Sequence, residues 1–291
     1  HDARHSGGAA TDGPRTETVR WRRQLEAAVT AGPVVAPDGT IYASSNGGVL
    51  HALDPSTGAD RWTYDSGQRG GGDLSVSPLV LPDSTALFPT PGRELVALSP
   101  AGRTLWSERL PGAPTSPASV DGHRVYVGDT SGYVSALEIT PGGHRLVWTL
   151  SVGSGSYGSV VVDGGRLYTT TSSSLVAVDD RGERGTVVWT RNPGDDITEV
   201  SAGRVQAWDI RTGRRAASYG PLPAQIWSST VLDRGYRLYF GTQDGHVLGL
   251  APDGTRLFDV RVGGPVDSYP ALSGDGVLLV GSRDGTLTAI G

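Results

Sequence analysis

The chain has 291 residues, with 25 basic and 30 acidic side chains, and its formal net charge of −5 argues against a nucleic acid partner. It contains no Cys, which excludes disulfides and thiol chemistry, and no apolar run approaches the roughly 20 residues of a transmembrane helix. The 43 Gly and 19 Pro residues suit many short strands joined by tight turns.

The first seventeen residues are expected to form a flexible polar tether. Residues 1–17 are rich in Gly and polar side chains and show no apolar periodicity. The chain begins at His1 and not at Met, so we expect that a segment preceded His1 or was trimmed from it. The tether would then connect the folded domain to a membrane anchor.

From Thr18 onward the sequence repeats a unit of about forty residues. Each unit contains a short apolar strand, a strand with Tyr or Val, a Gly turn, a third strand with a small residue before an apolar one, and an outer strand that usually carries Trp. A period of this length in a strand-rich sequence is typical of a β-propeller, with four antiparallel strands in each blade. The third strands of seven such units are centred on Ala52-Leu53, Ala97-Leu98, Ala136-Leu137, Ala177-Val178, Ala207-Trp208, Gly249-Leu250 and Ala289-Ile290.

The two ends of the repeat region complement each other. The chain ends at Gly291, directly after the third strand of the seventh unit, so that unit lacks an outer strand of its own. The segment from Thr18 to Trp21 has the sequence of an outer strand and can supply it. We therefore predict an all-β, seven-bladed propeller over residues 18–291 in which the N-terminal strand closes the last blade.

One unit, the blade around residues 190–217, is incomplete in this sequence. Ala177 and Ala207 are 30 residues apart, about ten fewer than the corresponding residues of the other units. The second strand is missing, which would leave the neighbouring strands without hydrogen-bond partners. Either this blade is degenerate, or residues near 200–203 are absent from the sequence, which is the interpretation that we favour.

The run from Ala52 to Trp62, ALDPSTGADRW, resembles the repeat of the pyrroloquinoline-quinone-like (PQQ-repeat) β-propellers. That family contains quinoprotein dehydrogenases, a propeller lipoprotein of the outer-membrane β-barrel assembly machinery, and extracytoplasmic sensor domains of bacterial serine/threonine kinases. The resemblance implies that the tryptophans pack between neighbouring blades. The dehydrogenases typically have eight blades and a vicinal disulfide, so the seven units and the lack of Cys favour the non-dehydrogenase branch.

Other motifs give no support for catalysis or metal binding. Gly153 to Gly158 satisfies G-x-G-x-x-G, but a strand follows instead of the helix that dinucleotide binding requires, so a flexible loop is the better interpretation. The Asp-Gly steps fall at hairpin turns, the six histidines show no ligand spacing, and there is no G-x-S-x-G motif. We expect neither a cofactor nor a metal site, and no enzymatic activity.

The candidate binding site lies where the first strand of a unit enters the central channel. Most units place small residues there, whereas three units offer an aromatic ring. These rings, together with nearby polar residues, are predicted to form an amphipathic floor for a small ligand or a peptide, and the alternative is that they only fill the channel. The predicted binding residues are Trp227, Tyr269, Tyr157, Arg69, Asp73, Gln225 and Asp267.

The sequence thus predicts a non-catalytic recognition or sensor propeller. It would bind a small molecule, a peptide or a protein at the rim of the channel, outside the cytoplasm, as part of a membrane-anchored bacterial protein such as a sensor kinase. Two alternatives stay open: an envelope scaffold lipoprotein that resembles the β-barrel assembly propeller, and a quinone-dependent dehydrogenase.

Overall fold

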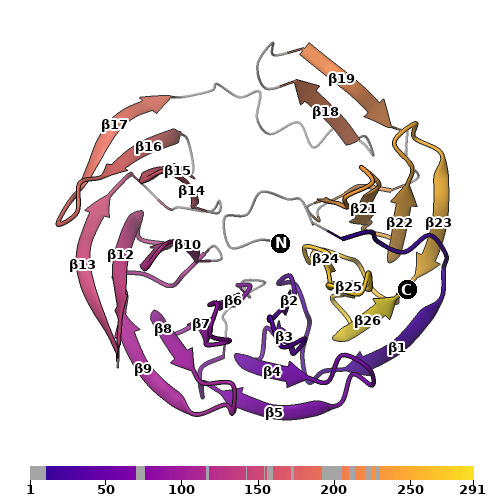
Figure 1. The fold of residues 1–291 in the computed structure, drawn as a ribbon, viewed down its shortest axis with the longest axis horizontal. Coiled ribbons are helices and arrows are strands. Elements are labelled where there is room, and N and C mark those ends of the chain that lie inside the picture. Colours follow the sequence, from indigo (N-terminus) through magenta and orange to yellow (C-terminus); the bar gives the residue numbers. More distant parts are fainter. Residues whose placement is uncertain are drawn as a thin grey trace.

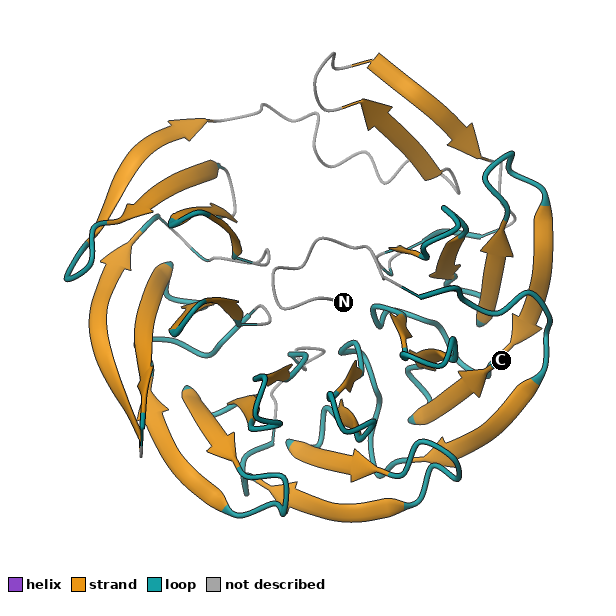
Figure 2. Cartoon of the chain, in the orientation of Figure 1, coloured by secondary structure: helices purple, strands orange, loops and turns teal. Residues whose placement is uncertain are grey.

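The computed structural model describes residues 11–69, 76–115, 118–141, 143–153, 155, 160–171, 174–191, 205–209, 214–219, 224–226, 228 and 230–291. All regular structure in these ranges is β-strand (Figure 2). The strands form sheets that are arranged in a ring around a central axis (Figure 1). No helix in the described ranges is long and apolar enough to cross a membrane.

Six sheets have four antiparallel strands each, ordered from the centre of the ring outward (Figure 1). Five of them use strands that are consecutive in the chain. These five are β2 (Val34–Val35), β3 (Ile41–Ser44), β4 (Val49–Leu53) and β5 (Asp60–Asp65); β6 (Leu79–Val80), β7 (Ala86–Thr90), β8 (Glu94–Leu98) and β9 (Thr104–Arg109); β10 (Ser119–Asp121), β11 (Arg124–Gly128), β12 (Tyr133–Thr140) and β13 (Gly143–Ser151); β14 (Val161–Asp163), β15 (Arg166–Thr170), β16 (Leu175–Asp180) and β17 (Gly185–Arg191); β20 (Val231–Leu232), β21 (Leu238–Gly241), β22 (His246–Leu250) and β23 (Arg256–Arg261).

The sixth four-stranded sheet combines both ends of the chain. It consists of β24 (Ala271–Leu272), β25 (Leu278–Gly281), β26 (Thr286–Ile290) and, as its outer strand, β1 (Val19–Gln24). In the antiparallel register of β1 and β26, Trp21 lies opposite Ala289. The N-terminal strand therefore takes the outer place that the sequence assigned to it.

The remaining described sheet is the two-stranded pair β18 (Val205–Asp209) and β19 (Arg214–Tyr219). It lies in the ring between the sheets of β17 and β23 (Figure 1). The second strand that the sequence analysis found missing would fall in residues 192–204, which lie outside the described residues. Seven complete blades therefore remain a prediction.

A β-bulge recurs in the outer strand of every sheet. In the first sheet Ala52 pairs with Trp62 and Leu53 pairs with Asp60, so Arg61 is the extra residue. The same shift occurs one residue before each aromatic position, including β19, where Ala217 replaces the aromatic residue. The bulged residues are Arg20, Arg61, Leu105, Val147, Val188, Ala216 and Leu257.

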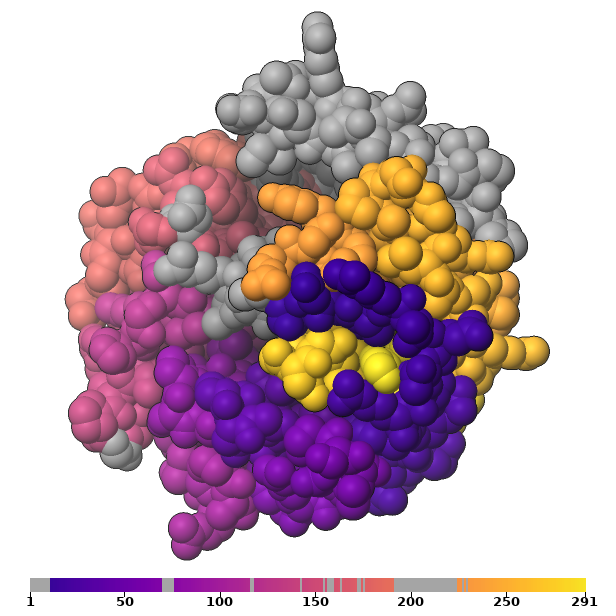
Figure 3. Space-filling model, turned by 45° about the vertical axis from the view of Figure 1, so that its right-hand side comes forward, coloured from indigo at the N-terminus to yellow at the C-terminus, as the bar shows by residue number. Residues whose placement is uncertain are grey.

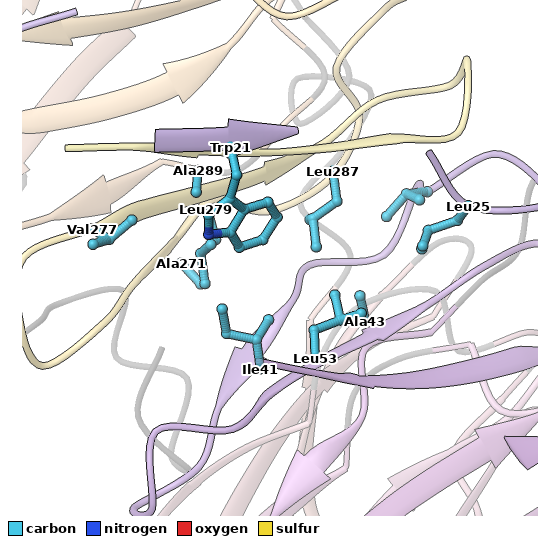
Figure 4. Close-up of a cluster of buried hydrophobic side chains, with 11 residues drawn as sticks. Trp21, Leu25, Ile41, Ala43, Leu53, Ala271, Val277, Leu279, Leu287 and Ala289 are labelled. Atoms are coloured by element: carbon cyan, nitrogen blue, oxygen red, sulfur yellow. The ribbon is translucent and has the colours of Figure 1, made fainter. Parts of the chain in front are cut away.

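The tryptophans join neighbouring sheets, as the family resemblance implied. The Trp21 ring is only 9% exposed and belongs to a cluster that includes Ile41 and Leu53 of the next sheet (Figure 4). Its indole N–H donates a hydrogen bond of 2.9 Å to the carbonyl oxygen of Pro55. Trp62 repeats this arrangement with the carbonyl oxygen of Pro100, at 2.8 Å.

The segment just before β1 is bound to the turn between β20 and β21. The Gly13 N–H donates to the carboxylate of Asp233 at 2.9 Å, and the Tyr239 hydroxyl donates to the carbonyl oxygen of Pro14 at 3.1 Å. Figure 3 shows this indigo segment lying across orange and yellow residues of the last two sheets. These contacts were not expected, because the sequence assigned residues 1–17 to a flexible tether; residues 1–10 lie outside the described residues.

Candidate functional site

The predicted binding residues lie on connections that lead from an outer strand to the next inner strand. The connections run over residues 66–78, 152–160, 220–230 and 262–270. Three of the seven residues lie outside the described residues, namely Asp73, Tyr157 and Trp227. The four that the structure describes are Arg69, Gln225, Asp267 and Tyr269.

Asp267 is held by turns of two sheets. Its carboxylate accepts a hydrogen bond from the side-chain amide of Gln243, in the β21–β22 turn, and forms an ion pair with Arg283, in the β25–β26 turn. The exposed fraction of its side chain is 14%. Asp267 therefore ties neighbouring sheets together, and a ligand would have to compete with these partners.

Gln225 is fixed through its backbone, not through its side chain. Its carbonyl oxygen accepts a hydrogen bond of 2.9 Å from the Gln243 N–H, and the carbonyl oxygen of Pro265 accepts one of 2.9 Å from the Arg283 N–H. The same backbone hydrogen bond therefore occurs in two successive sheets. It joins the connection that enters each sheet to the turn between the second and third strands of that sheet. The Gln225 side chain is exposed.

Arg69 is bound to a different turn from Asp267. Its guanidinium forms an ion pair of 2.7 Å with Asp65 and donates to the carbonyl oxygen of Gly47 in the β3–β4 turn, also at 2.7 Å. Both charged side chains are more than half exposed. Hydrogen bonding from Arg69 lowers the pKa of Asp65 to about 2.

Tyr269 packs against the entry of the first sheet. A Cβ atom placed on Gly32 would lie 2.8 Å from the carbonyl oxygen of Tyr269 and 2.9 Å from its Cβ atom. Tyr269 itself is half-buried. These contacts are made by the backbone and the Cβ atom of Tyr269, which an Ala at this position would keep.

Two serines make the same hydrogen bond in the connections that carry Trp227 and Tyr269. Ser228 donates to the carbonyl oxygen of Gly241 at 3.1 Å, and Ser268 donates to that of Gly281 at 2.8 Å, so the two serines occupy matching places. Tyr269 follows its serine in the chain, whereas Trp227 precedes the matching one. Trp227 and Tyr157 lie outside the described residues, so the shared aromatic rim stays a prediction.

A buried histidine links the closing strand to the first sheet, and the sequence analysis did not single it out. The His51 ring nitrogens lie 2.9 Å from a carboxylate oxygen of Asp60 and 2.8 Å from one of Glu26, and its side chain is only 8% exposed. Arg23 of β1 forms an ion pair with the same Asp60. The cluster connects β1 to β4 and β5, which indicates a structural role.

An apolar groove, which the sequence analysis did not find, lies at the opposite ends of the inner strands. Its volume is about 710 Å³, within the usual range of 300–1,000 Å³ for ligand pockets. It spans four sheets of the ring, along β24, β2, β6 and β10 and the turns that follow the first three of these strands. The lining residues are Val34, Val35, Ala36, Pro37, Gly39, Pro55, Pro78, Leu79, Val80, Leu81, Pro82, Val120, Leu272, Ser273, Gly274 and Asp275.

Carboxylates stand at the edge of this groove. Asp275 is the one ionisable residue of its lining, and Asp38 and Asp83 are direct chain neighbours of lining prolines. Asp38 and Asp83 each accept a hydrogen bond from a backbone N–H of their own turn, that of Thr40 or Thr85. A hydrogen bond from the Ser273 hydroxyl lowers the pKa of Asp275, so it is ionised at neutral pH.

A smaller, polar pocket of about 430 Å³ lies beside β15 and β16. Three of its charged groups are bound to one another, because Asp179 forms ion pairs with Arg166 at 2.7 Å and with Arg181 at 2.8 Å. Within the described ranges, no group of three or more His, Asp or Glu residues is arranged to hold a metal ion.

Comparison with known proteins decides the family. The model of a PQQ-repeat family that is described as outer membrane protein assembly factor BamB matches residues 9–219 of this chain. The chain belongs to this PQQ-repeat family. The structure of the chain is similar to that of BamB from Moraxella catarrhalis, with a TM-score of 0.56 and 19% sequence identity. The similarity covers 98% of this chain and 96% of that BamB chain, and it shows the propeller fold alone.

Curated relatives of this PQQ-repeat propeller carry two different names. This chain is 30% identical over 179 residues to the serine/threonine-protein kinase AfsK of Streptomyces griseus. The match covers 58% of this chain and 21% of the kinase. It is 26% identical over 191 residues to BamB of Yersinia pestis, and 28% identical over 132 residues to BamB of Nitrosomonas eutropha. These matches cover 60% and 44% of the chain but only 46% and 30% of the relatives, so the chain spans less than half of each protein.

Proposed function

We propose that this chain is a non-catalytic, protein-binding propeller of the bacterial cell envelope. The family match over residues 9–219 carries the proposal, because its description is that of an outer membrane protein assembly factor. Two of the curated relatives bear the same name. This assignment favours the envelope scaffold, which the sequence analysis held as an alternative, over the sensor.

The proposal includes a ring of seven blades. The pair β18 and β19 supports it, since this pair repeats the bulged register of the other outer pairs: Ala207 lies opposite Ala217, and Trp208 opposite Arg215. A ring with closed sheets has no long unprotected edge, and its loops offer extended surfaces at both ends for protein partners.

The test is identification of the partner in the cells that produce the protein. We expect that a tagged form of the full protein, cross-linked in intact cells and purified, brings with it a defined envelope protein in stoichiometric amount. Protease treatment of intact and of opened cells would locate the propeller outside the cytoplasm. Recovery of the tagged protein without a reproducible partner, or protection from protease by the cytoplasmic membrane, contradicts the proposal.

A second candidate is the sensor portion of a membrane-anchored kinase. The similarity to the kinase AfsK favours it, although the match covers only 21% of that protein. This candidate requires a kinase domain in the same polypeptide, which the complete coding sequence would reveal. It also keeps the predicted rim as a ligand site: replacing Trp227 and Tyr269 by Ala should then abolish ligand binding while leaving the melting temperature nearly unchanged.

A further inference from the structure

The apolar groove is partly exposed to solvent, although its valines also pack against the core clusters. Val35, Val80 and Val120 are only partly buried, although they lie on inner strands of the ring. Pro37 and Pro82 extend this apolar surface outward and are exposed. A concave, mostly apolar lining with a few polar groups is a common mark of a binding site.

The shape of the groove favours an extended occupant. Its lining comes from β24, β2, β6 and β10, which belong to four successive sheets of the ring (Figure 1). An extended chain can follow this lining and contact all four strands. Each inner strand is also an end strand of its sheet, so one of its backbone edges has no neighbouring strand in the described ranges and can bind a peptide backbone.

The charges around the groove define the chemistry of the occupant. Asp275 lines the groove, and Asp38 and Asp83 stand in its edge turns, where all three carboxylates are exposed to solvent. Arg20 offsets part of this charge through an ion pair of 3.2 Å with Asp275. Neither Asp38 nor Asp83 is joined by a described ion pair, so their charges favour a basic side chain on the occupant.

We propose that this groove binds an extended segment of a partner protein that carries aliphatic side chains and at least one Arg or Lys. The aliphatic side chains would cover the valines and prolines, and the basic group would lie between the carboxylates of Asp38 and Asp83. This inference rests on the proposed protein-binding function and places that function at the end of the channel opposite to the predicted aromatic rim.

The direct test is fluorescence anisotropy with two labelled octapeptides of Val, Leu and Pro that contain either two Arg or two Glu at the same positions. We expect the Arg peptide to bind the full chain at least about tenfold more tightly than the Glu peptide, and increasingly so at low salt. Equal affinity of the two peptides, or no binding by either, overturns the proposal.

Two variants locate the binding. Val80→Arg should reduce the affinity for the Arg peptide by at least about tenfold, because it fills the groove and repels the peptide. Val188→Arg is the matched control, since Val188 is 43% exposed on the outer strand β17, away from the groove. The double variant Asp38→Asn and Asp83→Asn keeps in each turn a side-chain oxygen that can accept the backbone hydrogen bond. It should lower the affinity for the Arg peptide by about three- to tenfold.

The same variants separate this inference from the proposed function. If the partner cross-linked in cells binds Val80→Arg as tightly as the unmodified chain, the groove assignment is wrong while the protein-binding function stands. If no partner is recovered at all, the proposed function fails whatever the peptides do. If the peptide binds only after residues 1–10 are removed, the groove binds a segment of the chain itself. If the chain forms dimers that Val80→Arg disrupts, as measured by light scattering, the groove binds a second copy. Either result overturns the proposal of a separate partner protein.

Discussion

The contact of Trp21 with the first sheet makes a quantitative prediction about how the last sheet is attached to the first. Replacing Trp21 by Ala removes a ring that is 9% exposed from between two sheets, together with its 2.9 Å hydrogen bond to Pro55. Loss of a buried aromatic ring costs about 3–5 kcal/mol when the site cannot collapse. The hydrogen bond accounts for about 1 kcal/mol of this amount. Because the two sheets contact each other through Ile41 and Leu53, the site has little room to collapse. We therefore expect Trp21→Ala to lower the free energy of unfolding by about 3–5 kcal/mol.

The assay is urea-induced unfolding followed by far-ultraviolet circular dichroism, which reports mainly on the strands. Trp21→Phe should lower the free energy of unfolding by only about 1–2 kcal/mol, because an aromatic ring remains and only the indole N–H is lost. Leu105→Ala is the control, since Leu105 is 54% exposed and its loss should change the free energy of unfolding by less than about 0.5 kcal/mol. A loss for Trp21→Ala that does not exceed that of Leu105→Ala would refute the assignment of this ring to the seam between the two sheets.

Three further predictions concern stability. Gly58→Ala should lower the free energy of unfolding by about 1–3 kcal/mol in the same assay, because φ is +70° there and the new Cβ atom would lie 2.6 Å from the Trp21 ring. Gly164→Ala is the control and should cost less, because φ is +55° and no atom lies within 4 Å of the new Cβ atom. Burial raises the pKa of Asp233, but hydrogen bonds from Gly13 and Arg237 outweigh it and hold the pKa below its usual value. The resulting stability is present above about pH 4 and is lost as the pH falls through the lowered pKa, so acid unfolding of Asp233→Asn should depend less steeply on pH in this range. Asp267→Asn should lower the melting temperature and leave binding of the Arg peptide unchanged, because Asp267 ties two turns at the other end of the channel; loss of peptide binding would contradict this.

The strand order of the fold could be predicted from the sequence because its signals are local. Ala52 lies opposite Trp62 in β4 and β5, so a small residue faces a large ring across one hairpin, and the same pairing recurs in other sheets. The Gly turns are equally local, as at Gly245 and Gly285, where φ is +86°. The outer place of β1 was predictable for a different reason: the last unit lacked a strand, and one remained unassigned near the start.

The binding surfaces were harder to predict because they depend on register and on distant partners. Tyr269 and Trp227 differ by two places relative to the matching serines, a shift that the hydrogen bonds of Ser228 and Ser268 define and the repeat alone does not. Gly13 contacts Asp233, which is 220 residues away in the chain, so a polar segment without periodicity gave no sign of being bound. The groove was missed because inner strands such as β2 have only two residues, too few for an alternating pattern.

The pairing of β1 with β26 also bears on how the molecule is made. These strands are more than 260 residues apart, so β1 leaves the ribosome long before its neighbour exists. Until then its backbone groups and the indole of Trp21 have no neighbour on the β26 side, and they are exposed to association with other chains. Pairing of β1 with β26 is therefore a late step of biosynthesis, and factors that shield the nascent N-terminal strand should improve the yield of folded protein.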